Sequence, residues 1–271
     1  MTLFTLAHRT VIEFKGEDAV AFLQGQTTND MTRLVPGACI YTVFLNSQGK
    51  FLNDAFVTML ALDHIWLDVE AEHAIELLKK LNMYKLRSKV VLALRVDIGV
   101  YACFDAPSLD NDALVMQDPR TAEMGYRVYT AKKQQASVDI AAYDMQRIRL
   151  CIPDGARDVP HERGFIMEYG FDRLNAIDFQ KGCYVGQELT ARMHYRKLGK
   201  RQLVCVEFET NAPASGADVT QDGVSVGMLR SVCGQLALAH IKTDALEANG
   251  IFMAEDKHMR VHKLGSADTV L

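Results

Sequence analysis

The sequence predicts an α+β protein whose C-terminal part is a small antiparallel β-barrel or sandwich. Two observations support this fold class. Between residues 41 and 104, strand-like segments and one amphipathic helix follow each other without the regular strand–helix–strand rhythm of a doubly wound sheet. After residue 199, short apolar segments are separated by turn residues such as the Asp222-Gly223 pair. We therefore expect one region over residues 1–198 and a β-barrel over residues 199–271.

Hydrophobic periodicity places the elements within these regions. The clearest is a helix over residues 70–83, where apolar side chains recur at the spacing of one buried helical face. A shorter helix is expected after Gly16, with Gly25 as its stop, and residues 105–125 are expected to form an exposed polar loop. The remaining expected elements are a helix over residues 139–148 and strands over residues 41–46, 51–59, 65–69, 90–96, 99–104, 203–208, 224–232, 235–241 and 259–264.

Composition excludes several classes of protein. Of 271 residues, 49% are hydrophobic and 24% are charged, which is typical of a globular chain and not of a disordered one. The formal net charge of −4 argues against a surface that coats nucleic acid. The sequence contains no run of about 18 apolar residues that would predict a membrane span. The N-terminus lacks the pattern of a secretory signal, so a cytoplasmic protein is expected.

One octapeptide concentrates the candidate chemistry. Residues 181–188 read Lys-Gly-Cys-Tyr-Val-Gly-Gln-Glu, and a helix is expected to begin at Glu188. Glycines on both sides of Cys183 allow a ligand to approach, and Lys181 favours a thiolate. The N-terminus of the helix offers N–H groups to an anionic or polar ligand. The alternative is an ordinary turn with a structural cysteine. The six cysteines form no C-x-x-C pair, so no zinc ribbon or permanent metal site is predicted.

The octapeptide closely resembles the signature of the YgfZ family of folate-binding, iron–sulfur-related proteins. Further stretches agree with the family's blocks in the right order, so that the resemblance covers essentially the whole chain. Cys151 is a departure, because the family pattern has a glycine at this position. The agreeing stretches are residues 22–30, 45–50, 84–90, 147–153, 160–162 and 222–227.

The resemblance implies a fold shared with the T-protein, the tetrahydrofolate-dependent aminomethyltransferase of glycine cleavage. Residues 1–198 would form two interleaved α+β subdomains, which together with the barrel would surround a central cavity. The implied function is that of a folate-binding accessory protein without classical turnover. It would support the assembly or repair of iron–sulfur enzymes, including tRNA-modifying ones, through a reactive Cys183. Tetrahydrofolate is the implied cofactor, and iron–sulfur assembly or client proteins are the implied partners.

The expected folate contacts follow from this resemblance. Asn29 and Asp54 offer amide and carboxylate groups to the pterin edge, and Arg192 can meet the glutamate tail. The signature would add Lys181, Tyr184, Gln187 and Glu188. Cys183 is also a candidate transient ligand for iron, although a cluster usually needs about four protein ligands, so a partner would supply the others.

Two other functions stay open. A tetrahydrofolate-dependent one-carbon transferase needs a carboxylate at the reacting nitrogen. Asp54 could serve there, but Asn53 replaces the first of the two aspartates in the T-protein pattern. A tRNA-binding regulatory module is the other alternative, because residues 192–201 are basic and contain interleaved aromatic side chains. The alternative is that this segment is only a solvent-exposed linker that leads into the barrel.

Overall fold

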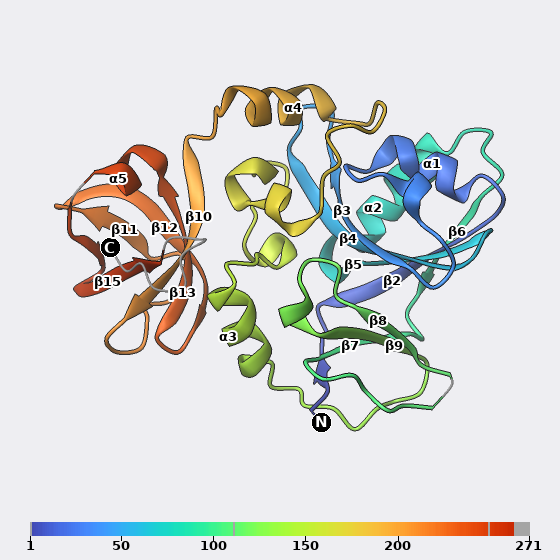
Figure 1. Ribbon diagram of the computed structural model, residues 1–271, viewed down its shortest axis with the longest axis horizontal. Helices are drawn as coiled ribbons and strands as arrows, with labels where there is room; N and C mark the ends of the chain where they lie inside the picture. The colour runs from blue at the N-terminus through green and yellow to red at the C-terminus, as the bar shows by residue number, and fades with distance from the viewer. Residues whose placement is uncertain (1, 111, 249, 263–271) are drawn as a thin grey trace. The chain divides into compact units, whose positions relative to one another are not determined.

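The computed structural model describes residues 2–110, 112–248 and 250–262, and the chain divides into two compact units (Figure 1). Unit 1 contains Met1–Ile140, His161–Arg163 and Phe171–Ala191. Unit 2 contains Ala141–Pro160, Gly164–Gly170 and Arg192–Leu271. The α+β class with a C-terminal barrel is confirmed, whereas the division of the chain at residue 199 stays a prediction.

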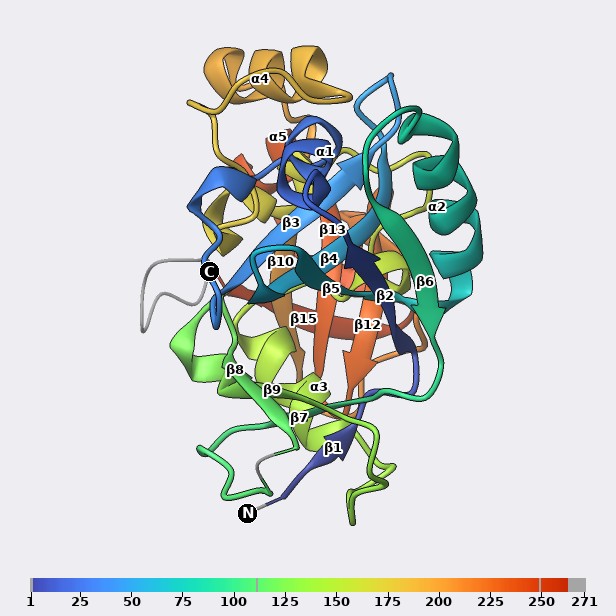
Figure 2. The ribbon, with the colours of Figure 1, turned by 90° about the vertical axis from the view of Figure 1, so that its right-hand side faces the viewer.

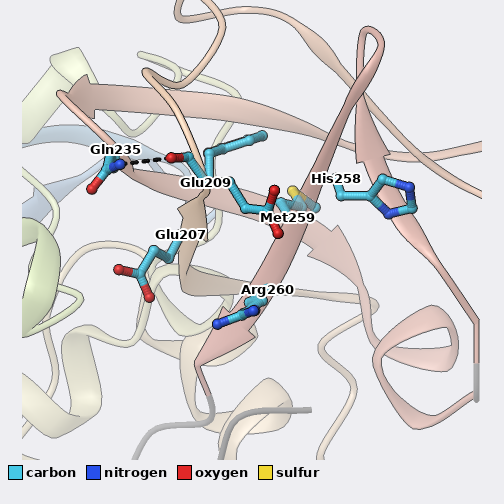
Figure 3. A pocket seen from close by; sticks show the side chains of 7 residues that line it. Glu207, Glu209, Gln235, His258, Met259 and Arg260 are labelled. Carbon is cyan, nitrogen blue, oxygen red and sulfur yellow. Dashed lines mark hydrogen bonds between the residues drawn. The ribbon is translucent and has the colours of Figure 1, made fainter.

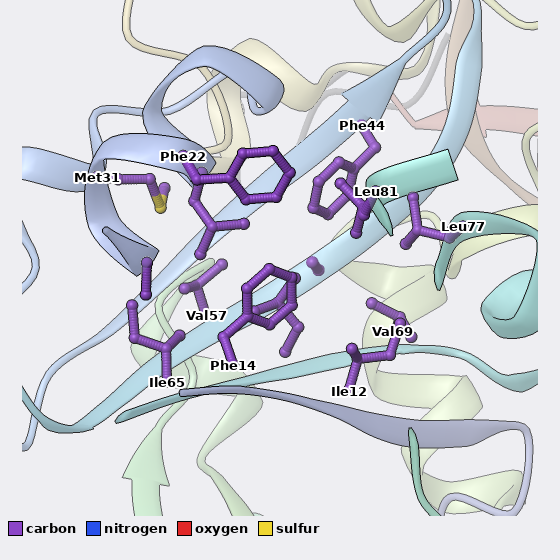
Figure 4. Packing of buried hydrophobic residues seen from close by; sticks show 14 of the residues in the cluster. Ile12, Phe14, Phe22, Met31, Phe44, Val57, Ile65, Val69, Leu77 and Leu81 are labelled. Atoms are coloured by element: carbon purple, nitrogen blue, oxygen red, sulfur yellow. The ribbon is translucent and has the colours of Figure 1, made fainter. Parts of the chain in front are cut away.

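Unit 1 is built on a five-stranded antiparallel sheet with the order β3-β4-β5-β2-β6. Helices α1 and α2 pack on one face of this sheet. Figure 4 shows the buried core that lies between the helices and the sheet. Phe22 of α1 and Leu77 of α2 meet Phe14, Val57 and Val69 of the strands there. The bounds are β2 Arg9–Lys15, β3 Cys39–Leu45, β4 Phe51–Ala61, β5 His64–Glu70, β6 Val91–Arg95, α1 Ala19–Gln26 and α2 Ala71–Tyr84.

A second, four-stranded sheet of unit 1 has the order β1-β7-β9-β8 (Figure 2). It corrects one expectation, because residues 105–125 contain a strand and a 3-10 helix instead of a loop alone. The bounds are β1 Phe4–Thr5, β7 Gly99–Cys103, β8 Leu114–Gln117 and β9 Tyr126–Thr130, with 3-10 helices at Met31–Arg33, Ala122–Met124 and Phe171–Leu174.

Buried charges connect the two sheets of unit 1. Asp68 of β5 accepts hydrogen bonds from Arg9 of β2, at 2.7 Å, and from Arg127 of β9. The hydroxyl of Tyr129 donates to the same carboxylate at 3.0 Å. Burial alone would raise the pKa of Asp68, but Arg127 and Arg9 hold it below its ordinary value. The carboxylate is therefore charged at neutral pH and ties three strands together.

Unit 2 contains a closed six-stranded antiparallel barrel with the order β10-β13-β12-β11-β14-β15. Its strands include two short ones that the sequence did not predict, β11 and β14. Of the expected strand over residues 259–264, the last two residues lie outside the described part of the chain. The bounds are β10 Arg201–Phe208, β11 Asp218–Gln221, β12 Val224–Cys233, β13 Leu236–Lys242, β14 Phe252–Ala254, β15 Lys257–His262 and α5 Thr243–Glu247.

The rest of unit 2 precedes the barrel in sequence and contacts it through buried polar groups. Arg147 of α3 forms ion pairs with Asp144 and Asp158 and donates to Ser231 of β12 at 2.6 Å. Cys151 follows this helix with a φ of 52°, a left-handed conformation that explains why a glycine suits the position. The bounds are α3 Ala141–Arg149 and 3-10 helices at Gly155–Arg157 and Ile166–Tyr169. Across the described residues, no helix has the length and apolar character needed to cross a membrane.

Replacing the shared carboxylate should destabilise unit 1. In Asp68→Asn, two buried guanidinium groups lose their common anion, so we expect the free energy of unfolding to fall by about 3 kcal/mol. Chemical denaturation measures the change. Asp97→Asn is the matched control, because Asp97 pairs with Arg95 at the surface and should matter little. Equal stability of the wild type and Asp68→Asn would contradict the role given to the network.

Candidate functional site

The signature loop at residues 181–186 is held to unit 1 at its first residue. The ammonium group of Lys181 donates to the carbonyl oxygens of Gln24, Thr27 and Asn29 at 2.8, 2.6 and 2.7 Å. These carbonyls belong to the last turn of α1 and to the residues just after it, so the cation lies near the negative end of the helix dipole. Helix α1 itself continues through Gly25 and ends at Gln26, one residue beyond the expected stop at Gly25.

The bonds to the carbonyls give Lys181 a structural role that the sequence did not predict. Its side chain is buried, and burial lowers its pKa to about 8. The ammonium group lies 5.1 Å from the centre of the Tyr184 ring. Tyr184 is itself buried, which raises the pKa of its phenol to about 12 and keeps it neutral. Both residues thus anchor the loop, and their predicted contact with folate stays a prediction.

A second attachment lies at the other end of the loop, where two glycines from different blocks of the sequence meet. Gly186 has a φ of 83°, and a Cβ there would lie 2.7 Å from the carbonyl oxygen of Asn46 and 3.1 Å from the Cα of Gly49. Gly49 turns the β3–β4 hairpin with a φ of 70°. Only glycine allows both backbones this approach. The hairpin turn and the signature loop are therefore packed tightly against each other.

Cys183 lies between these two anchors and is exposed. The other five cysteines, all within the described residues, are less accessible. Burial raises the pKa of the thiols of Cys39 and Cys205 to about 12 and that of Cys103 to about 11. The buried Cys151 thiol donates to a carbonyl at 3.4 Å. Among the cysteines of the described residues, Cys183 is thus the one most open to a second protein.

Helix α4, Gln187–Arg196, continues directly from the loop. Gln187 is half-buried at its first position, and its N–H donates to the carbonyl of Tyr184 at 3.3 Å. Glu188 is exposed in the first turn. Arg192 is exposed as well and belongs to unit 2. The roles predicted for these three residues stay predictions.

Asp54 is enclosed inside unit 1, and both of its carboxylate oxygens accept hydrogen bonds. Its Oδ1 accepts from Arg9 at 2.6 Å, and its Oδ2 accepts from the hydroxyl of Tyr41 at 2.8 Å. Asn53 points to the opposite face of β4, where its Oδ1 accepts from the N–H of Glu70 at the start of α2. Both side chains of the Asn53-Asp54 pair are therefore engaged in the structure of the sheet. The predicted contact of Asp54 with a pterin stays a prediction.

Asn29 lies beside a hollow of about 310 Å³ in unit 1. Its amide nitrogen donates to the carbonyls of Tyr41 and Asn175 at 2.8 and 2.6 Å, so the side chain also fixes the local backbone. Arg33 and Asp178 form an ion pair of 3.3 Å at the same hollow. The volume of this hollow is at the lower end of the range for small-molecule sites, and the polar groups that line it include hydrogen-bond donors and acceptors. It is lined by Asn29, Arg33, Cys39, Ile40, Tyr41, Pro119, Asn175, Ile177 and Asp178.

Unit 2 has a hollow of its own, of about 370 Å³, on barrel strands β10 and β15 (Figure 3). Its charged side chains lie apart from one another in the view, and Gln235 bonds the backbone of Glu209. None of the residues predicted for the site line this hollow, which is formed by Glu207, Phe208, Glu209, Gln235, His258, Met259 and Arg260.

One group of potential ligands in unit 1 was missed by the sequence analysis. His73, Glu76 and His161 bring two imidazoles and a carboxylate within 4.8 Å of one another. His73 and Glu76 are three residues apart on α2, which is a detectable spacing on a helix. His161 lies far along the chain, so no local pattern joins it to the other two.

The sequence and the structure both match known proteins. Residues 1–99 match the GCVT N-terminal domain family, and residues 200–267 match the CAF17 C-terminal beta-barrel domain family. The iron-sulfur cluster assembly factor IBA57, mitochondrial, of Mus musculus is 31% identical over 282 residues, covering 91% of this chain and 79% of that protein. The protein of the same name from Homo sapiens is 31% identical over 278 residues, covering 90% and 78%.

A solved structure shows the same fold. The glycine cleavage system aminomethyltransferase T from Bartonella henselae superposes with a TM-score of 0.78 at 17% sequence identity. The match covers 97% of this chain and 85% of the other. The expected aminomethyltransferase-like fold is thereby confirmed, whereas the narrower resemblance to the YgfZ family stays a prediction.

Adding a single methyl group at Gly186, where the signature loop contacts the β3–β4 hairpin turn, should destabilise the protein. In Gly186→Ala, the left-handed backbone and the clash with the Asn46 carbonyl should lower the free energy of unfolding by about 2 kcal/mol or more. Gly182→Ala is the control in the same loop, because a Cβ there meets no atom within 4 Å. Its unfolding free energy should stay within about 0.5 kcal/mol of the wild type. Denaturant titration compares the two, and equal losses would argue against the packing described.

Proposed function

Because this chain belongs to the family of IBA57 iron–sulfur cluster assembly factors, we propose that it supports the assembly or repair of iron–sulfur enzymes through Cys183. The observation that carries the proposal is the exposed thiol between two anchored ends of the signature loop. In this proposal tRNA-modifying iron–sulfur enzymes are among the clients, and the protein has no classical turnover of its own.

The chemistry proposed for Cys183 is ligation or thiol exchange with a partner protein. A thiolate is a soft ligand for iron, and an exposed loop lets a second protein bring its own ligands close. Since [2Fe–2S] and [4Fe–4S] clusters usually take about four protein ligands, one cysteine of this chain is not enough. The partner, an assembly or client protein, supplies the others. The cluster is cargo in this scheme and not a resident cofactor.

Tetrahydrofolate is the second part of the proposal, with the hollow beside Asn29 as its site. Donors and acceptors around this hollow suit the edge of a pterin, and Arg33 suits the carboxylates of the glutamate tail. We keep Glu188 as a proposed further contact, and the contact predicted for Arg192 stays a prediction. Bound folate would supply one-carbon chemistry or a signal of its availability, and the residues of this chain would orient it. The narrower kinship with the YgfZ family belongs to this folate proposal.

The alternative functions receive less support. A one-carbon transferase would need a carboxylate that can exchange a proton, and the Asp54 carboxylate is enclosed and bonded on both oxygens. A tRNA-binding role rests on the basic segment of residues 192–201 alone. The related mouse and human proteins are named mitochondrial, and for this chain a cytoplasmic location stays a prediction.

The thiol of Cys183 should be required where the other thiols are not. Cys183→Ser removes the soft sulfur at almost constant size, so we expect a folded protein that no longer supports iron–sulfur enzymes. The measurement is the activity of several such enzymes in a deletion strain carrying the variant. Cys233→Ser is the matched control, because that thiol is half-buried and donates to the carbonyl of Ala141 at 3.3 Å. Full support by Cys183→Ser would refute the thiol proposal.

Folate binding should depend on Arg33. In Arg33→Gln the tail carboxylates lose a charged donor, so the Kd for tetrahydrofolate should rise about three- to tenfold. Isothermal titration calorimetry of the full chain measures it, with Arg87→Gln as control because Arg87 is exposed outside the hollow. The absence of saturable heat up to millimolar folate would overturn the proposal. Such a result would leave the role of Cys183 intact.

A further inference from the structure

We propose that His73, Glu76 and His161 in unit 1 form a binding site for a divalent first-row transition-metal cation. The proposal does not rest on the function proposed for Cys183 or on folate. It rests on three side chains from two distant parts of the sequence, whose potential ligand atoms all lie within 4.8 Å of one another.

The backbone on both sides of the cluster is fixed. Helix α2 presents His73 and Glu76 on one face, with His73 Nδ1 and Glu76 Oε2 4.0 Å apart. His161 lies in the short segment His161–Arg163, which belongs to unit 1. The N–H of Glu162 donates to the carbonyl of Phe51 of β4 at 2.8 Å, and Lys50 donates to the carbonyl of Arg163 at 3.0 Å. Two hydrogen bonds thus hold His161 beside α2.

The ligand atoms are close to the spacing that a metal ion requires. With bonds of about 2.1 Å, two ligands of a tetrahedral ion lie about 3.4 Å apart. The observed separations need to close by less than about 1.5 Å, which side-chain rotation supplies. The rings of His73 and His161 are stacked, with centroids 3.8 Å apart and planes 5° from parallel. Metal binding therefore tilts the rings out of this stack, so that their lone pairs converge, while the exposed Glu76 reorients.

The ligand types select the class of cation. Two imidazole nitrogens and one carboxylate oxygen suit zinc and its first-row neighbours, with open positions left for water or substrate. Magnesium and calcium prefer oxygen ligands alone.

The charges around the cluster set its affinity. Lys80, one turn after Glu76, lines the same small hollow with Leu52 and Leu77. Burial lowers the pKa of Lys80, and the carboxylates of Glu162 and Glu76 oppose that shift. Its ammonium group repels a cation and competes for Glu76. Glu72 and Glu162 are the other charges that act on His161, and both attract a cation.

Metal titration of the full-length chain tests the proposal. Isothermal titration calorimetry with Zn²⁺ and the absorbance of bound Co²⁺ are measured in a Cys183→Ser background, so that the exposed thiol cannot bind the metal. We expect one saturable site. His161→Ala and His73→Ala should each weaken binding about tenfold or more, whereas His258→Ala, on the barrel, should leave it unchanged. Thermal unfolding of each variant checks that it is folded.

A second variant changes the affinity in the opposite direction. Lys80→Met removes the competing cation and should tighten Zn²⁺ binding about threefold or more. Unchanged affinity in His161→Ala, or no saturable Zn²⁺ binding below millimolar concentration, would show that the stacked histidines only pack against α2. Neither result would affect the role proposed for Cys183, which is measured by enzyme activities.

Discussion

The ammonium group of Lys181 is the contact on which the signature loop depends. It donates to the carbonyl of Gln24 in the last turn of α1 and to the carbonyls of Thr27 and Asn29 just after the helix. It therefore satisfies a carbonyl that the end of the helix leaves without an intrahelical partner, together with two carbonyls of the segment that follows. The N–H of Val185 adds a bond to the carbonyl of Gly25. Once these contacts form, Tyr184 is buried and Gly186 reaches the hairpin turn. Only the short stretch around Cys183 remains exposed, and its position is set from both sides.

The sequence predicted the elements of the fold where hydrophobic periodicity is strong. Helix α2, the β3–β4 hairpin and the longer barrel strands were found within a few residues. Strand β2 was missed, because Arg9 and Glu13 make it look polar although both are buried. Arg9 pairs with Asp68, and Glu13 accepts from His64, Trp66 and Arg95. Periodicity cannot detect a charge whose partner lies on another strand. The short strands β8, β11 and β14 were missed because they contain too few residues to show a pattern.

The sequence identified the motif that forms the candidate site, but it did not predict which distant residues contact the side chains of that site. The octapeptide marked Cys183 as the residue of interest, and the structure places that thiol in the open. The same motif suggested that Lys181 activates the thiol, whereas its ammonium group serves carbonyls 152 to 157 residues away in sequence. Asp54 was considered as a ligand for pterin, whereas it pairs with Arg9 inside the sheet. In both cases the partner comes from a distant part of the chain, which local sequence does not reveal.

Charge inside unit 1 is used for structure, and this bears on where chemistry can occur. Both oxygens of Asp54 and of Asp68 accept bonds from arginines and tyrosines, so a reaction at either carboxylate would first have to break a buried ion pair, at a cost of about 3–5 kcal/mol. An exposed thiol carries no such cost. The exposed thiol of Cys183 can also be approached by the surface of another protein, whereas an enclosed active site accepts only a small molecule. The proposed function thus uses a fold shared with an aminomethyltransferase in a different way: the soft ligand lies on a fixed loop, and the enclosed carboxylates hold the sheets together.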